Sequence, residues 1–187
     1  MKELTKQAIA KTLNELLEKQ SIEQITIKKI TEQCGINRQT FYYHFCDIYD
    51  LIEWSLTKAL SDYLLENPFP EGDWNVKVEH VFNFLITKRK IILHGYNHEN
   101  RNIYEMFIIK MIRPIVTEKF YQCQGSNKLP NDKQEFIIKI HVWLFTALFF
   151  EWIENGMTEE FVDKFQDFFI LINGSLEASI NKFIENK

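Results

Sequence analysis

The chain has 187 residues, of which 45% are hydrophobic and 26% are charged, and its formal net charge is −4. This balance excludes a disordered or collagen-like chain, and three cysteines without a CxxC spacing exclude a disulfide scaffold. Only 6 Gly and 4 Pro stand beside 16 Phe, 7 Tyr and 4 Trp. The composition therefore favours an all-α protein with long helices and short connections.

The first part of the chain predicts three helices, over residues 4–20, 27–34 and 38–45. Apolar residues recur at helical spacing in the first of them. Short polar residues precede the second and third helices, where their oxygens can cap the first turn, and a glycine between these two helices supplies a left-handed residue. The residues that set these boundaries are Thr26, Gly35 and Asn37.

A fourth helix is expected to begin after Asp47 and to run to about Leu65, where the breakers of residues 67–72 end it. Four longer helical segments follow the breakers, at residues 74–94, 103–121, 131–154 and 161–183. Pro114 is expected to kink the second of these segments.

Residues 26–45 have the order of a helix-turn-helix, in which the second helix presents its N-terminal residues to base edges in the major groove. Arg38 can bind guanine, Gln39 can bind adenine, and the methyl group of Thr40 can contact thymine. Aromatic side chains with polar tips follow and can donate to phosphate oxygens. They are Tyr42, Tyr43 and His44.

The string ITIKKITEQCGINRQTFYYHF, from Ile25 to Phe45, resembles the DNA-binding signature of the TetR/AcrR family of bacterial transcription regulators. The resemblance covers residues 4–56. It implies a homodimer that binds a palindromic operator on double-stranded DNA, under the control of an effector bound to the C-terminal body, and we expect a repressor rather than an activator. The residues expected at the DNA are Thr26, Lys28, Lys29, Asn37, Arg38, Gln39, Thr40, Tyr42, Tyr43 and His44.

The expected organisation is a DNA-binding domain at residues 1–46, a connecting helix at 47–66, and a regulatory and dimerisation domain at 67–187. The first of these is mildly basic, and the rest of the chain is acidic. A second resemblance lies at residues 150–161, FEWIENGMTEEF, which are similar to a helix end in the branch of the family that includes dihydroxyacetone-kinase operon activators. Both a small molecule and another protein therefore stay open as the effector.

The sequence departs from the family pattern in two places. Ile48 stands where the family commonly has a Lys that meets a phosphate, which should weaken nonspecific DNA affinity. Gln20 and Ser21 stand where a Gly frequently closes the first helix. Ile48 and the acidic net charge are the only support for the alternative function, a helical ligand-binding or protein-interaction module that has lost DNA binding.

No catalytic motif is present, since the chain has no GxSxG, Walker A, GxGxxG or HExxH pattern, so we expect neither an enzyme nor a bound cofactor. His94 and His98 are close in sequence, but Gly95 interrupts the helix that would align them. We expect no metal site there.

Residues 136–152 are apolar on almost every side, and a helix of this kind must be buried on both faces. One stripe includes Phe136, Ile140 and Trp143, and the other includes Ile137 and Leu144. A homodimer with a four-helix interface would bury both stripes, whereas the alternative is an unusually large monomer core. The expected interface residues are Ile137, Leu144, Leu148, Phe165, Phe169, Ile172, Leu176 and Ile180, and Gly174 and Ser175 would allow a neighbouring helix to approach closely.

The candidate walls of an effector pocket are mostly aromatic or apolar, which favours an uncharged or amphipathic effector over a phosphorylated one. For any single candidate residue, packing in the hydrophobic core is as good an explanation as a pocket wall. The longest uncharged apolar run, Val142 to Phe150, is shorter than the ~20 residues of a membrane span, so we expect a cytoplasmic protein. The pocket candidates are Phe82, Ile86, His94, Tyr96, Tyr104, Phe107, Met111 and Trp143.

Overall fold

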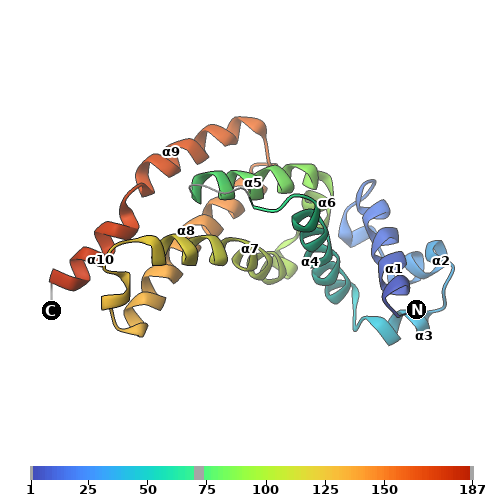
Figure 1. Cartoon of the computed structure of the whole chain (residues 1–187). Helices are drawn as coiled ribbons and strands as arrows, with labels where there is room; N and C mark the ends of the chain where they lie inside the picture. Colours follow the sequence, from blue (N-terminus) through green and yellow to red (C-terminus); the bar gives the residue numbers. More distant parts are fainter. Residues whose placement is uncertain (1, 70–73, 186–187) are drawn as a thin grey trace. The chain divides into compact units, whose positions relative to one another are not determined.

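The computed structural model describes residues 2–69 and 74–185, and every regular element in these ranges is a helix, as the composition predicts (Figure 1). Short 3-10 turns join several of the longer helices. The α-helices are α1 (Lys2–Leu17), α2 (Ile27–Cys34), α3 (Arg38–His44), α4 (Ile48–Glu66), α5 (Trp74–Thr87), α6 (Arg89–Gly95), α7 (Arg101–Gln122), α8 (Asn131–Glu154), α9 (Val162–Ile172) and α10 (Ser175–Glu185).

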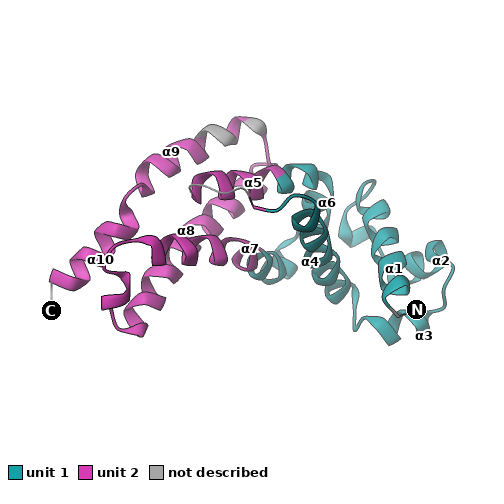
Figure 2. Ribbon diagram, in the orientation of Figure 1, with its two compact units in different colours: residues 1–68, 84–107 teal, residues 69–83, 108–187 magenta. Residues whose placement is uncertain are grey.

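The chain folds as two compact units (Figure 2). Unit 1 contains residues 1–68 and 84–107, and unit 2 contains residues 69–83 and 108–187. The division falls within α5 and within α7. The functional boundaries expected after residues 46 and 66 stay predictions. The breaker cluster expected at residues 67–72 lies partly outside the described residues.

The core of unit 1 forms where α1 packs against α2, α3, α4 and α6. Its side chains come from apolar positions at helical spacing, and burying them supplies most of the stabilisation of the head. The helices of the head are too short to be stable alone, so this packing holds them. The fully buried members include Ile9, Leu13, Leu17, Ile30, Phe41, Phe45, Leu51 and Ile52.

Asp47 caps α4 as the sequence predicts. Its carboxylate accepts hydrogen bonds from the backbone N–H groups of Tyr49 (2.8 Å) and Asp50 (2.9 Å). The carboxylate of Asp50 in turn accepts the backbone N–H of Cys46 at 2.9 Å. The two acidic residues thereby fix the angle at which the chain leaves α3 and enters α4.

Two of the expected long helices are each broken into two. The expected helix 74–94 is interrupted at Lys88, just after Thr87, whose hydroxyl donates to the carbonyl oxygen of Phe84 at 2.7 Å. The expected helix 161–183 ends at Ile172, and Gly174 has a φ of +73°. That left-handed residue turns the chain. No described atom lies within 4 Å of the position a Cβ of Gly174 would take, and the expected close approach of a neighbouring helix there stays a prediction.

Unit 2 is built around α8, which begins and ends where the sequence predicts. Aromatic residues pack against it: the ring of Phe82 contacts those of Trp152 and Phe165, with centroids 5.5 and 3.7 Å apart. Pro114 lies inside α7, which continues through it, and the expected kink stays a prediction. By length and composition α8 could cross a membrane, but more than half of its apolar window is buried in the protein, as in the core helix of a soluble protein.

Candidate DNA-binding site

The turn of the helix-turn-helix has the caps that the sequence predicts. The hydroxyl of Thr26 accepts the backbone N–H of Lys29 at 3.2 Å, which starts α2. Gly35 ends the helix with a φ of +71°, and the next N–H, that of Ile36, donates to the carbonyl oxygen of Thr31 at 3.0 Å. This is the glycine-ended arrangement that reverses a chain after a helix.

Asn37 caps the recognition helix α3. Its Oδ1 accepts the backbone N–H of Thr40 at 2.7 Å and the hydroxyl of Thr40 at 3.1 Å. The hydroxyl proton of Thr40 is therefore used inside the protein, which leaves the methyl group to meet a base. Phe41 is fully buried and anchors the helix on the core of the head.

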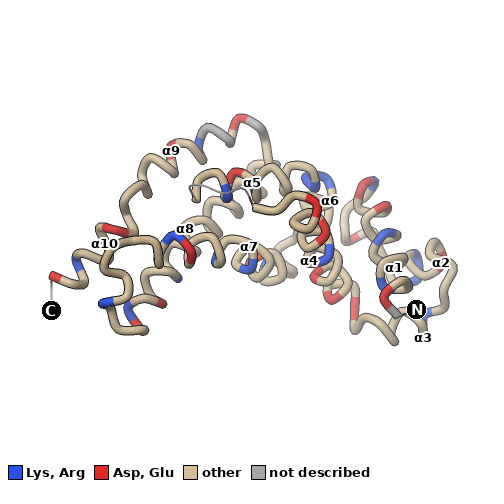
Figure 3. Tube along the Cα trace, in the orientation of Figure 1, with Lys and Arg blue, Asp and Glu red and all other residues tan. Residues whose placement is uncertain are grey.

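Arg38 and Gln39 are the free polar residues of this helix. Both are exposed, and neither forms a hydrogen bond or ion pair with any residue that the structure describes. Arg38 is also the one Lys or Arg in α3, which carries no Asp or Glu (Figure 3). Side chains of this kind at the first turn of a recognition helix can bind base edges bidentately.

The aromatic residues of α3 divide between surface and core. Tyr43 is 64% exposed and Tyr42 is also exposed, so their hydroxyls reach solvent. His44 is half-buried beside the rings of Tyr43 and Phe45. The exposed tyrosines can therefore donate to phosphate oxygens, and His44 is less accessible than the sequence suggests.

The two lysines of α2 have only surface partners. Lys28 lies 3.7 Å from the carboxylate of Glu32, and both side chains are exposed. The ammonium group of Lys29 donates to Oε1 of Gln20 at 2.6 Å. Exposed contacts of this kind contribute little free energy, so either lysine can exchange its partner for a phosphate.

Ile48 is half-buried at the first position of α4, between the capping carboxylates of Asp47 and Asp50. The start of α4 therefore offers a phosphate backbone no side-chain cation, and the N–H groups of Tyr49 and Asp50 are already used by the carboxylate of Asp47. Two carboxylates stand beside it instead. This arrangement explains physically why the departure from the family pattern should lower nonspecific affinity.

The pocket candidates divide between the two units. Tyr104 and Phe107 are buried in unit 1 and each lines a small cavity, of about 10 and 20 Å³ respectively. Ile86 and Trp143 are exposed. His94 and Tyr96 are half-buried in unit 1, and Phe82 and Met111 are buried in unit 2. The effector pocket stays a prediction.

His94 bonds to the protein itself, because its Nδ1 lies within hydrogen-bonding distance of the carbonyl oxygen of Leu17. Among the described residues, no group of three or more His, Cys, Asp or Glu side chains could hold a metal ion.

The expected interface residues lie mostly inside unit 2. Leu144 is exposed, and Leu148 and Phe169 are half-buried. The exposed large apolar residues of α8 come from both stripes: Phe136 and Trp143 from one, and Leu144 from the other. The sequence showed both stripes, but periodicity alone does not say which one a chain covers by itself. The buried members are Ile137, Phe165, Ile172, Leu176 and Ile180.

Comparison with known proteins agrees with this geometry. The family model described as "Bacterial regulatory proteins, tetR family" matches residues 5–53, and the one described as "Transcriptional regulator C-terminal region" matches residues 72–174. A search of curated proteins found no match.

Among solved structures, the dihydroxyacetone kinase operon activator DhaS is similar over 95% of this chain and 96% of its own, with a TM-score of 0.57 and 18% identity. At that identity the likeness concerns the fold alone. The two family models, one on the helix-turn-helix head and one on the helical body, show what the chain is: a member of the TetR family of bacterial transcription regulators.

Proposed function

We propose that this protein is a sequence-specific DNA-binding regulator that acts as a homodimer on a palindromic operator and represses the genes beside it. The observation that carries the proposal is the pair of exposed side chains without an internal partner among the described residues, Arg38 and Gln39, on the first turn of a capped helix. Every other polar residue of that turn is used by the caps.

In this proposal Arg38 reads guanine, Gln39 reads adenine, and the methyl group of Thr40 contacts thymine. Tyr42, Tyr43 and His44 fix the register of the helix by donating to phosphates, and Lys28 and Lys29 add charge contacts to the backbone. Thr26 and Asn37 contribute mainly through the positions of α2 and α3, because their side-chain oxygens accept internal hydrogen bonds.

The homodimer is supported by the exposed stripe of α8. Phe136, Trp143 and Leu144 are large apolar residues of this helix that stay exposed, and Ile140 and Leu148 beside them are half-buried. A stripe of this size on one helix marks an interaction surface, and a twofold dimer would cover it with its own copy. Two heads related by that axis would meet successive major grooves, about 34–36 Å apart.

Selection of bound duplexes from a random DNA pool tests the DNA-binding part. The wild type should enrich a palindrome. Arg38→Ala should lose about 1–3 kcal/mol of operator affinity and relax one position of each half-site, and Gln39→Ala should relax another. Tyr43→Phe should weaken all sequences about equally. Equal losses on operator and random DNA from Arg38→Ala would contradict its role as a base reader.

Sedimentation of surface variants tests the dimer. Trp143→Glu places a charge on the proposed interface and should give monomers. Met106→Glu is the matched control, because Met106 is a similarly exposed apolar residue, at 51% against 46% for Trp143, on α7. A dimer that survives Trp143→Glu and Leu144→Glu would place the interface elsewhere.

The effector, a small molecule or another protein, would act by binding the two states of the dimer unequally, typically by about 1–3 kcal/mol. A folded dimer that enriches no sequence and shows no salt-dependent DNA binding would favour the alternative function, a ligand-binding or protein-interaction module.

A further inference from the structure

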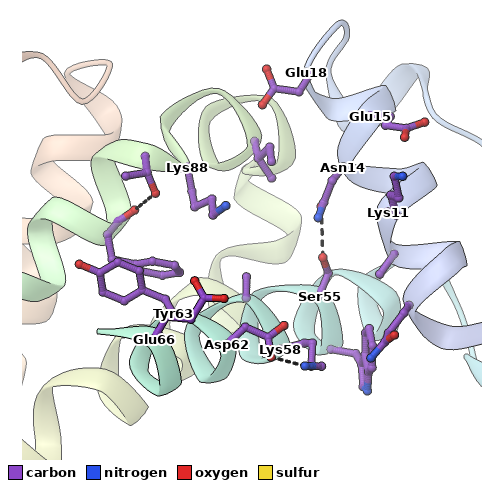
Figure 4. A pocket seen from close by; sticks show the side chains of 17 residues that line it. Lys11, Asn14, Glu15, Glu18, Ser55, Lys58, Asp62, Tyr63, Glu66 and Lys88 are labelled. Atoms are coloured by element: carbon purple, nitrogen blue, oxygen red, sulfur yellow. Dashed lines mark hydrogen bonds and ion pairs between the residues drawn. The ribbon is translucent and has the colours of Figure 1, made fainter. Parts of the chain in front are cut away.

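An open groove of about 750 Å³ lies within unit 1, between α1, α4 and the junction of α5 and α6 (Figure 4). None of the pocket candidates named from the sequence lines it. Its walls carry both apolar and charged side chains. Trp54, Ala59, Phe84 and Ile91 supply apolar surface, and the ring of Tyr63 packs on that of Phe84 with centroids 4.8 Å apart.

The groove continues into a smaller cavity of about 20 Å³, with which it shares Asn14, Ser55 and Lys88. A space of this size holds about one small polar group. Ser55 is buried, and its hydroxyl donates to Oδ1 of Asn14 at 3.1 Å, across the α1–α4 contact. That bond orients the amide of Asn14 so that its NH₂ group is left to donate.

Lys88 supplies the charge at this point. It precedes α6 without capping it through its side chain, and its ammonium group has no hydrogen-bond or ion-pair partner among the described residues. Figure 4 shows Lys88 and Asn14 directed into the groove from opposite walls. Two unused donors, one of them cationic, therefore border the same small cavity, and an oxyanion is the group that complements them.

The acidic residues of the groove do not reach this cavity. Four carboxylates line the wider groove, but among the nine described residues around the small cavity Lys88 is the one charged residue. Asp62 is paired with Lys58, and the carboxylate of Glu15 accepts from Nε2 of Gln33 at 3.3 Å. The four carboxylates are Glu15, Glu18, Asp62 and Glu66.

We propose that this groove is a binding site for an organic monocarboxylate with an apolar or aromatic body. The carboxylate lies at Lys88 and Asn14, and the body lies along Phe84, Ala59 and Trp54. The wider part of the groove carries four carboxylates against the ammonium groups of Lys11 and Lys58, and this excess of negative charge disfavours a second negative charge on the ligand. A dicarboxylate or a phosphorylated sugar therefore binds more weakly than a monocarboxylate.

The site is placed to affect the head. α1 packs against α2 and α3 as well as against α4 and α6. A ligand between α1, α4 and Lys88 would therefore contact the helix on which both helices of the helix-turn-helix pack. A further small void of about 10 Å³ is also lined by Asn14 and Ser55. Binding would change the DNA affinity by holding α1 in one position, a consequence that rests on the proposed function.

Calorimetric titration of the full-length protein without DNA tests the site. The probes are octanoate and benzoate, each beside its neutral amide, and octylammonium. Octanoate or benzoate should bind saturably, and the amides should bind about tenfold more weakly, since they lack the charge that Lys88 pairs with. Lys88→Gln should abolish this preference for the acid.

Arg89→Gln is the matched control, because it removes the same charge from the neighbouring exposed residue, which does not line the groove. It should leave octanoate affinity within about twofold, since an exposed charge acts weakly at a distance. Thermal unfolding of Lys88→Gln should match the wild type, because its side chain does not cap α6.

No saturable binding of either acid, an unchanged acid preference in Lys88→Gln, or tighter binding of octylammonium would each overturn the proposal. Arg38→Ala should bind octanoate as the wild type does. Carboxylate binding and DNA binding are thus measured separately. If the protein binds octanoate but enriches no DNA sequence, the proposed function is refuted and the proposed carboxylate site is supported.

Discussion

The imidazole of His94 bonds through Nδ1 to the carbonyl oxygen of Leu17, the last residue of α1. Two residues after the end of α6, the chain contacts the head again: the amide of Asn97 donates to the carboxylate of Glu23 at 3.1 Å. Hydrogen bonds from two points of this segment therefore hold the far end of α1 and the turn after it. His94 therefore has a structural role in unit 1, and its expected place in an effector pocket stays a prediction.

Gly95 lies between these contacts, and we predict that it accepts no side chain. A Cβ there would stand 2.5 Å from the hydroxyl oxygen of Tyr104, which is buried. Gly95→Ala should therefore lower the free energy of unfolding by about 1–3 kcal/mol. Urea unfolding measures the loss.

The double variant Gly95→Ala with Tyr104→Phe is the control for this prediction. Without the hydroxyl, the nearest ring atom, Cζ, lies 3.8 Å from the new Cβ, which is an ordinary contact. The double variant should be more stable than Gly95→Ala alone. If Tyr104→Phe gives no rescue, the steric explanation fails.

Neighbouring residues of α3 should separate stability from recognition. Asn37→Ala removes the acceptor of the Thr40 N–H at 2.7 Å and should cost about 1 kcal/mol of stability in urea unfolding. Arg38→Ala should leave stability within about 0.5 kcal/mol, because the side chain is exposed and forms no hydrogen bond or ion pair with a described residue. Its loss should appear in operator affinity alone. Equal unfolding midpoints for Asn37→Ala and Arg38→Ala would disprove the prediction that Asn37 stabilises α3 and Arg38 does not.

Ile48→Lys should restore the phosphate contact that the family pattern commonly has at this position. We expect tighter binding to random DNA and an increase of about 1 in the slope of log K against log salt. Ile48→Gln is the matched control, since it is polar and of similar length but uncharged. Fluorescence anisotropy between about 50 and 200 mM salt measures both. An equal effect of Gln and Lys would show that charge is not the cause.

His141 should make the protein less stable in mild acid. It is buried where α8 meets α10, with Nδ1 2.8 Å from the carbonyl oxygen of Ile137 and Nε2 2.9 Å from the hydroxyl of Ser175. Burial lowers the pKa of His141 below its ordinary 6.5, although the Ile137 carbonyl and Glu177 partly oppose this.

The unfolded chain therefore takes up the proton first, so this stability is complete above pH 6.5 and is lost as the pH falls toward the lower folded pKa. The free energy of unfolding of the wild type should fall as the pH is lowered below 6.5. His141→Gln should fall less. His98→Gln, at an exposed histidine, should follow the wild type. If His141→Gln lost as much unfolding free energy in mild acid as the wild type, the loss would belong to other titratable groups.

The caps and the turn of the head could be read from the sequence because they depend on local chemistry. Thr26, Gly35, Asn37 and Asp47 each act on backbone groups within a few residues, so their roles follow from residue type and spacing. The breaks at Lys88 and Gly174 were missed because apolar residues keep a helical period on both sides of each break.

The faces of α8 could not be assigned for a different reason. Both stripes are apolar, so the periodicity does not distinguish the stripe that covers the protein's own core from the one left exposed. Ile137 is buried and Phe136 is exposed, although they are adjacent and equally apolar. The sequence could not separate pocket walls from core for the same reason, since aromatic residues such as Phe82 and Tyr104 also serve as core.

The division of labour between Asn37 and its neighbours bears on how such a regulator evolves. The fold of α3 depends on Asn37, Thr40 and Phe41, whereas Arg38 and Gln39 carry no structural duty that the described residues show. A duplicated copy of the gene can therefore change codons 38 and 39 and acquire a different target sequence without passing through an unstable intermediate. Selection for new regulation and selection for folding act on separate positions of one helix.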